Sequence, residues 1–189
     1  MTDYARTTFV DRSAPAVNAA YLNGLEAGVW GAGPGSIIES AERTFPFDVQ
    51  AVGTTWTLVE GVIIDVEAQS RPWLLEYTSL ATAQTGTSAA SSLITIQAEI
   101  NDITSGQPGS VYSNGHFTAM QGAAASTKTW VGVVHCFKPM PPTSSLRRFA
   151  LFGRQSVAAI SGWTNAYLYG GDVPVQDVYP PMVLLARSL

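Results

Sequence analysis

From residue 55 onward the chain is divided into short runs of strand-forming residues, and this pattern constrains the fold more than any other feature. Clusters rich in Gly, Pro, Asn and Ser, such as Ser105–Gly109 and Ser113–Gly115, separate the runs and indicate turns. In Leu93–Ile100 apolar residues alternate with Thr95, Gln97 and Glu99, as in a half-buried strand. We therefore predict strands at Thr55–Val59, Val62–Ala68, Trp73–Tyr77, Ser92–Ile100, His116–Met120, Lys128–Phe137, Leu146–Phe152, Val157–Ile160, Ala166–Tyr169 and Met182–Ala186.

About ten short strands with no helix among them predict a mainly β fold, namely an antiparallel β-sandwich of the jelly-roll type. The order of these strands resembles the trimeric TNF-like heads of phage fibres, in which the apolar C-terminal run after Pro181 would be a central or inter-subunit strand. Both faces of Lys128–Phe137 carry apolar residues, so we expect this strand to be covered on both sides. One of these faces holds Val131, Val133, His135 and Phe137, and the other holds Gly132, Val134 and Cys136.

A short α-helix is predicted before this β region. Ser13 can cap its first turn, and Pro15 fits there because no intrahelical donor is lost. The helix carries one apolar stripe, formed by Val17, Tyr21, Leu22, Leu25 and Val29. A helix of this length is marginal in water, so the stripe must pack on a copy of itself, on the following domain, or on a partner.

Three glycines and a proline in Trp30–Ser36 end the helical pattern and mark a boundary. We divide the chain into an N-terminal segment at 1–30, a Gly/Pro linker and lead-in at 31–45, and a β-sandwich head domain at 46–189.

The order Phe-x-Asp-x-x-x-Pro-x-x-Asn-Ala-x-x-Leu-Asn-x-x-Glu-x-Gly runs from Phe9 to Gly28. It resembles the start of bacteriophage tail-fibre, baseplate and head-fibre proteins, over about the first thirty residues only. In those families the segment attaches a fibre to the virion or begins a trimeric stem. The resemblance implies a virion protein assembled in the host cytoplasm and a homotrimer bound to other virion proteins. It assigns attachment or oligomerisation to Phe9, Val17, Tyr21, Leu22, Leu25 and Val29.

Charged residues make up only 13% of the chain, against about 25% in ordinary globular proteins, which favours burial of surface against other subunits. The formal charge of −4 and the scattered Lys and Arg residues argue against nucleic-acid binding. No stretch approaches the roughly 20 apolar residues that span a bilayer, and no signal segment opens the chain, so we expect neither membrane insertion nor secretion.

The sequence carries no recognisable enzyme motif, and we expect no enzymatic activity, no cofactor and no metal site. Gly31-x-Gly-x-Gly35 lacks the strand and helix that flank a dinucleotide site, so we interpret it as linker. His116 is expected near a turn and His135 half-buried, while the lone Cys136 is expected to be a buried, inert thiol. Asp65 and Glu67, with Glu76 expected nearby in space, have a glycosidase-like spacing, but we interpret them as outer-face carboxylates.

Binding is a better-supported role than catalysis, because the chain is rich in Trp and Tyr. We expect Trp56 and Trp130 in the core. Aromatic rings beside amide and carboxylate groups can bind a sugar, and the candidate set is Trp163, Asn165, Tyr167, Tyr169 and Asp172. A subunit seam or the core is the competing interpretation of that set.

The sequence thus predicts a non-enzymatic bacteriophage structural protein: a homotrimeric tail fibre or spike with a head that binds a cell-surface glycan. A capsid-decoration, head-fibre or neck protein is the first alternative, and a carbohydrate-binding module is the second.

Overall fold

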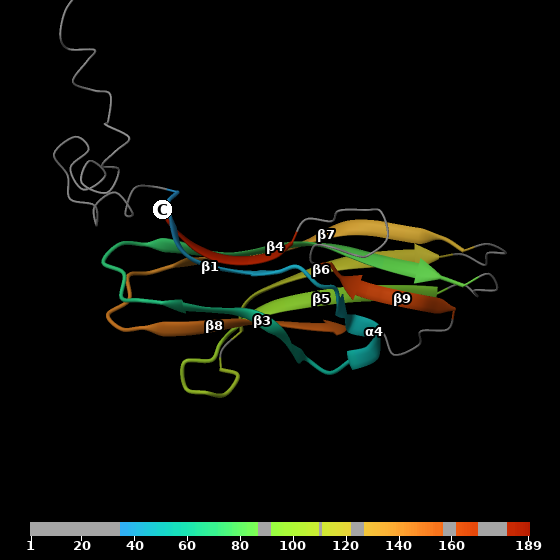
Figure 1. The fold of residues 1–189 in the computed structure, drawn as a ribbon, viewed down its shortest axis with the longest axis horizontal. Coiled ribbons are helices and arrows are strands. Elements are labelled where there is room, and N and C mark those ends of the chain that lie inside the picture. The colour runs from blue at the N-terminus through green and yellow to red at the C-terminus, as the bar shows by residue number, and fades with distance from the viewer. Residues whose placement is uncertain (1–34, 87–91, 110, 122–126, 157–161, 170–180) are drawn as a thin grey trace, which may run out of the picture.

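The computed structural model describes residues 35–86, 92–109, 111–121, 127–156, 162–169 and 181–189. They form two antiparallel sheets, which Figure 1 shows as two layers, with β1, β4 and β7 in one and β3, β5 and β8 in the other. The predicted mainly β fold is therefore confirmed. The predicted N-terminal helix, the whole apolar stripe and Phe9 lie outside the described residues.

The first sheet, called sheet A, is built around the long strand β4 (Trp73–Thr85). Along one edge of β4, β10 (Met182–Ser188) pairs with its first half and β9 (Trp163–Leu168) with its second half. Along the other edge, β7 (Thr129–Met140) pairs with nearly its full length. The outer positions are taken by β1 (Ile37–Arg43), paired with β10, and by the two-residue β2 (Phe47–Asp48), paired with β9.

The second sheet, sheet B, has the order β3-β8-β5-β6. Its strands are β3 (Thr57–Val66), β8 (Arg147–Gln155), β5 (Ser92–Asp102) and β6 (Val111–Gln121). At one end of this sheet the Arg147 Nε donates to Asp102 Oδ2 at 3.0 Å, and a second guanidinium nitrogen bonds the same oxygen. Burial raises the pKa of Asp102, but hydrogen bonds from Thr104 and the Arg147 guanidinium lower it by more, so the net shift is downward.

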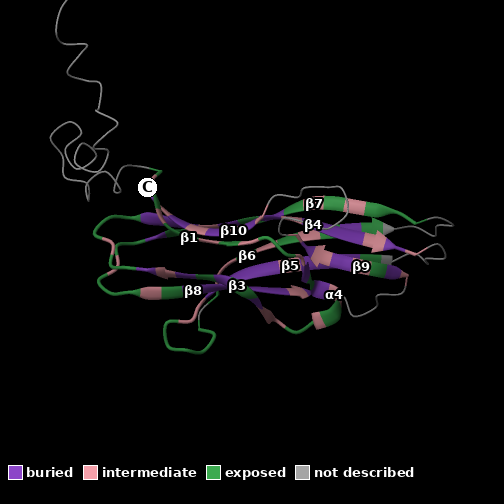
Figure 2. Ribbon diagram, in the orientation of Figure 1, coloured by how far each residue is buried: buried purple, intermediate pink, exposed green. Residues whose placement is uncertain are grey.

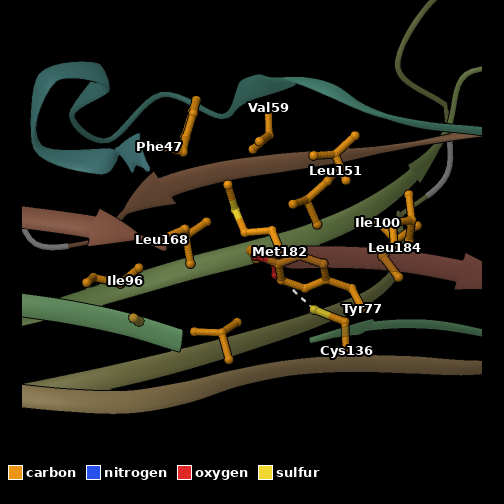
Figure 3. Close-up of a cluster of buried hydrophobic side chains, with 14 of the residues drawn as sticks. Phe47, Val59, Tyr77, Ile96, Ile100, Cys136, Leu151, Leu168, Met182 and Leu184 are labelled. Carbon is orange, nitrogen blue, oxygen red and sulfur yellow. Dashed lines mark hydrogen bonds between the residues drawn. The ribbon is translucent and has the colours of Figure 1, made fainter. Parts of the chain in front are cut away.

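The core lies between the sheets, where strand alternation directs the apolar side chains. Figure 3 shows Leu151 and Ile100 of sheet B facing the same region as Met182 and Leu184 of sheet A. The largest buried side chains include Trp73, which meets Phe149 edge to face with ring centroids 5.7 Å apart.

A short helix, α4 (Val49–Val52), links the two sheets at one end. Asp48 caps it, because the Asp48 carboxylate accepts the N–H groups of Gln50 and Ala51, both at 2.9 Å. Gly53 follows the last turn at φ 67°, a left-handed conformation that glycine adopts without a Cβ penalty. The sequence did not indicate this helix.

Most predicted strands are present, and their boundaries differ. The two runs Thr55–Val59 and Val62–Ala68 are one strand, β3, whose pairing with β8 shifts register between Leu58 and Ile63. The expected turn at Ser113–Gly115 is wrong, since these residues lie within β6. The expected strand Val157–Ile160 lies outside the described residues.

Part of the stretch that we assigned to a linker, 31–45, belongs to the fold. Ile37–Arg43 is strand β1, which pairs with β10. Its pattern escaped sequence reasoning because Ile37 and Ile38 are adjacent, and the register shifts between Ile37 and Glu39. The C-terminal strand β10, in contrast, is central as predicted, because it pairs with β1 on one edge and β4 on the other.

Candidate functional site

Strand β7, on the outward side of sheet A, has more exposed large apolar side chains than any other described strand. On β7, Val131, Val133 and Phe137 are 54–57% exposed. These three residues, called the ridge, alternate with Gly132, Val134 and Cys136, which face the other sheet. Figure 2 shows much of β7 as exposed, whereas β5 is buried. The prediction that both faces of this strand are covered is therefore wrong for the single chain.

The inward side of β7 is covered by β6, which crosses it at very short distance. A Cβ on Gly132 would lie 2.1 Å from the Phe117 ring, and one on Gly115 would lie 2.3 Å from the backbone oxygen of His135. A side chain at Gly115 would therefore require the His135 backbone to shift, and one at Gly132 would require the Phe117 ring to move. The two glycines thus let β6 and β7 close this margin of the molecule, which leaves the ridge pointing away from the core.

A hollow of about 320 Å³ lies on the same outward side, where β1, β10 and β4 meet. It is lined by Gly35, Ile37, Glu76, Thr78, Val183, Leu185 and Arg187. Val183 and Leu185 alternate with the core residues Met182 and Leu184 along β10, so they point outward. Ile37 is 63% exposed at the rim. Sequence reasoning did not name these residues, although the alternation in the C-terminal run was the signal that could have found them.

A hydrogen bond and an ion pair, both made by Glu76, join the ridge and the hollow. Glu76 Oε1 lies 3.0 Å from His135 Nε2, and Glu76 Oε2 lies 3.1 Å from the Arg187 guanidinium. The His135 ring stacks on Phe137, with centroids 5.5 Å apart. The negative charge of Glu76 is thus paired with Arg187 on the neighbouring strand. The apolar groups around Glu76 therefore do not face an unpaired carboxylate. His135 was expected to be half-buried, and its side chain is 43% exposed.

A polar and aromatic cluster continues this face across β9 and β4. The Tyr167 hydroxyl donates to Asn165 Oδ1 at 3.4 Å, and Asn165 Nδ2 donates to Gln84 Oε1 at 2.8 Å. Tyr167 and Tyr169 meet edge to face, 5.8 Å apart. The pKa of Tyr167 is raised by burial, and further by the charges of Asp48 and Tyr169. Three members of the candidate sugar-binding set are therefore close together.

The other two members of that set do not join them. Trp163 is only 4% exposed, and its ring packs on Trp130 with centroids 5.2 Å apart. In a regular strand Trp163 and Asn165, which are two residues apart, would point to the same side. A register shift in the pairing of β9 with β4 lies between them, and it turns the Trp163 ring inward. A buried ring offers no free face to a sugar, so Trp163 belongs to the core. Asp172 lies outside the described residues.

On the outward side of sheet B, hydrogen bonds join polar side chains in pairs, next to the exposed apolar residues Ile63, Leu93 and Met120. Arg148 binds both carboxylate oxygens of Asp65 at 2.6 Å, and this hydrogen bond lowers the pKa of Asp65 despite some burial. Arg154 donates to Gln97 at 2.9 Å, and its guanidinium lies 4.3 Å from the Trp56 ring centre. Trp56, which we expected in the core, is therefore a half-buried residue beneath an arginine.

The remaining candidates for chemistry are dispersed. Asp65 is on sheet B and Glu76 on sheet A, each held by an arginine, so they do not form a pair of carboxylates across one site. Cys136 is 1% exposed, as predicted, and burial together with the charge of Glu99 raises its pKa to about 12. Within the described ranges, no three His, Cys, Asp or Glu side chains gather as metal ligands.

Comparison with protein-family models and with curated proteins finds no match for this chain. Among the described residues, no helix has the length and apolar character needed to cross a membrane.

Proposed function

We propose that this protein is a non-enzymatic structural subunit of a bacteriophage virion, a tail-fibre or spike protein whose head assembles as a homotrimer through the outward side of sheet A. The observation that carries the assembly is the ridge. Val131, Val133 and Phe137 are more than half exposed in a strand whose other side is buried. Contiguous exposed apolar surface of this kind marks an interface in soluble proteins.

The strand order supports a jelly-roll head of the TNF-like kind. Without the short β2 and β9, sheet A reads β1-β10-β4-β7 and sheet B reads β3-β8-β5-β6. Sheet A has six strands and sheet B four, so four strands of each sheet remain when β2 and β9 are set aside, and the core lies between the sheets. Two facing four-stranded sheets with crossing connections are the pattern of a jelly roll, a fold that viral coat and lectin domains use.

The difference between the two outward sides supports sheet A as the side that meets other subunits. Polar and charged side chains bind one another across sheet B, as in Arg148 with Asp65 and Arg154 with Gln97. Such pairs are stable in water. Sheet B also exposes Ile63, Leu93 and Met120, but sheet A exposes three large apolar side chains on one strand beside an apolar hollow, and burial of such groups is favourable by about 25 cal/mol per Å².

The virion assignment is supported by the resemblance of the first thirty residues to phage attachment segments. In this proposal Phe9, Val17, Tyr21, Leu22, Leu25 and Val29 hold the subunit to other virion proteins, and the head projects from the particle. A capsid-decoration, head-fibre or neck protein is the alternative location, since the resemblance fits those proteins equally.

Sugar binding is the second candidate function, and the Tyr167–Asn165–Gln84 chain of hydrogen bonds favours it. Tyrosine rings beside amides are suited to neutral sugars, which combine apolar ring faces with hydroxyl groups. In this reading Tyr167, Tyr169 and Asn165 contact a cell-surface glycan.

Light scattering on the purified full-length chain tests the assembly, and a mass of three chains is the expected result. A mass of one chain at all concentrations would refute the homotrimer. Labelling of phage particles with an antibody to this protein then tests the location: label on the tail supports the fibre, label on the capsid supports the decoration protein, and unlabelled particles refute the virion assignment.

A further inference from the structure

Ridge and hollow are complementary features on one rigid sheet. The ridge projects from β7, and the hollow opens over β1, β10 and the adjoining part of β4, so the two features are neighbours on the sheet. Phe137 of the ridge pairs directly with Glu76 of the hollow, on strands about 4.8 Å apart, and both features point in the same direction. The ridge of a chain therefore cannot enter the hollow of the same chain.

The two features also match in chemistry. The ridge presents two valines and a phenylalanine, with His135 between Val133 and Phe137 held by Glu76 of the same chain. The hollow presents Ile37, Val183 and Leu185 beside Thr78, and among the described residues that line it the charged side chains, Glu76 and Arg187, bind each other. A mainly apolar projection suits such a surface, whereas a charged ligand would find its counter-ion already engaged.

We propose that the ridge of one copy of this protein seats in the hollow of a second copy. This pairing rests on the proposed self-association and specifies which surfaces meet. Each copy offers one ridge and one hollow, so a contact between two copies leaves one of each available for the next. Repetition of such a contact closes a ring when the rotation between copies permits it, as three copies would in the proposed homotrimer.

Mixing of two full-length variants tests the pairing. Val133→Asp places a carboxylate on the ridge, and Leu185→Asp places one in the hollow. Both side chains point outward, so the fold is retained, which circular dichroism and thermal melting verify. Met120→Asp is the matched control, because Met120 is 70% exposed on the outward side of sheet B.

Sedimentation velocity gives the expected results. Wild type and Met120→Asp have the same oligomeric mass, and each of the two interface variants alone has the mass of one chain. An equimolar mixture of the two interface variants doubles that mass, because the intact ridge of the Leu185→Asp chain fits the intact hollow of the Val133→Asp chain.

Two outcomes would overturn the pairing while leaving the proposed function intact, since wild type would still be oligomeric. The mixture could stay at the mass of one chain at the highest attainable concentration. Leu185→Asp could keep the wild-type mass, which would exclude the hollow from the contact. A wild type that is itself monomeric refutes the proposed function as well.

Discussion

A graded series at Val133 examines the energetics of the proposed interface. Val133→Ala removes two methyl groups, each worth about 0.8 kcal/mol when moved from water to an apolar site. The side chain is 57% exposed in the single chain, so assembly can bury only that fraction, and the loss is about 0.9 kcal/mol per contact. Three equivalent contacts in a trimer give about 2.7 kcal/mol, which lowers the trimerisation constant about 100-fold.

Val133→Asp has a larger expected effect, because an unpaired carboxylate in a dry contact costs several kcal/mol more than the lost methyl groups. We expect this variant to be monomeric where wild type is trimeric. Sedimentation equilibrium over a range of concentrations measures the association constants of wild type and Val133→Ala and sets an upper limit on that of Val133→Asp. The thermal melting temperature measured at a dilution where wild type dissociates should be unchanged, since the single chain leaves this side chain largely in water.

Equal association constants for wild type, Val133→Ala and Val133→Asp would refute this reasoning, since burial of the ridge requires a graded loss. A loss as large for Met120→Asp as for Val133→Asp would also refute it. In that case added negative charge, rather than the position on sheet A, would cause the dissociation.

Two predictions concern the fold itself. Gly115→Ala should destabilise the protein by about 3 kcal/mol, because the new Cβ meets the backbone oxygen of His135 at 2.3 Å. Gly86→Ala, with 3.4 Å to its nearest neighbour, should change stability by less than about 1 kcal/mol; equal urea midpoints for the two variants would contradict the close crossing. The folded-state pKa of Asp102 lies below 3.8, since burial raises it but hydrogen bonds from Thr104 and its arginine partner lower it by more. The stability that ionised Asp102 adds through these bonds is therefore fully present above pH 3.8 and is lost as the pH falls through the lowered pKa. Acid unfolding of Asp102→Asn should not show this loss.

Local patterns were sufficient for the β class and for many of the strands. Alternation in Leu93–Ile100 predicted the inward residues of β5, all of which lie in the core. The apolar C-terminal run predicted a central strand, and β10 is central. These predictions succeeded because the period of a strand and the residues that break it are properties of a few consecutive positions.

The candidate site was less predictable. Trp163, Asn165 and Tyr167 are spaced two residues apart, so strand alternation alone would put all three on one side. The Trp163 ring is nevertheless in the core, and Tyr167 is on the outward side. A register shift in the pairing of β9 with β4 separates them. Such an irregularity depends on the partner strand, which is some eighty residues away in the chain, and no local pattern of β9 contains it.

Local alternation from Trp130 to Phe137 was enough to predict that β7 has two apolar faces. It did not show which face is covered, because Val134 and Val133 are equivalent in that pattern. The covered face follows from the crossing of β6 over Gly132 and the packing of sheet B against one side of the strand, which are contacts between distant parts of the chain. The hollow likewise exists only because β1, β4 and β10 come together from distant parts of the chain. Coverage is a property of long-range neighbours, and an uncovered apolar face is therefore visible only once those neighbours are in place.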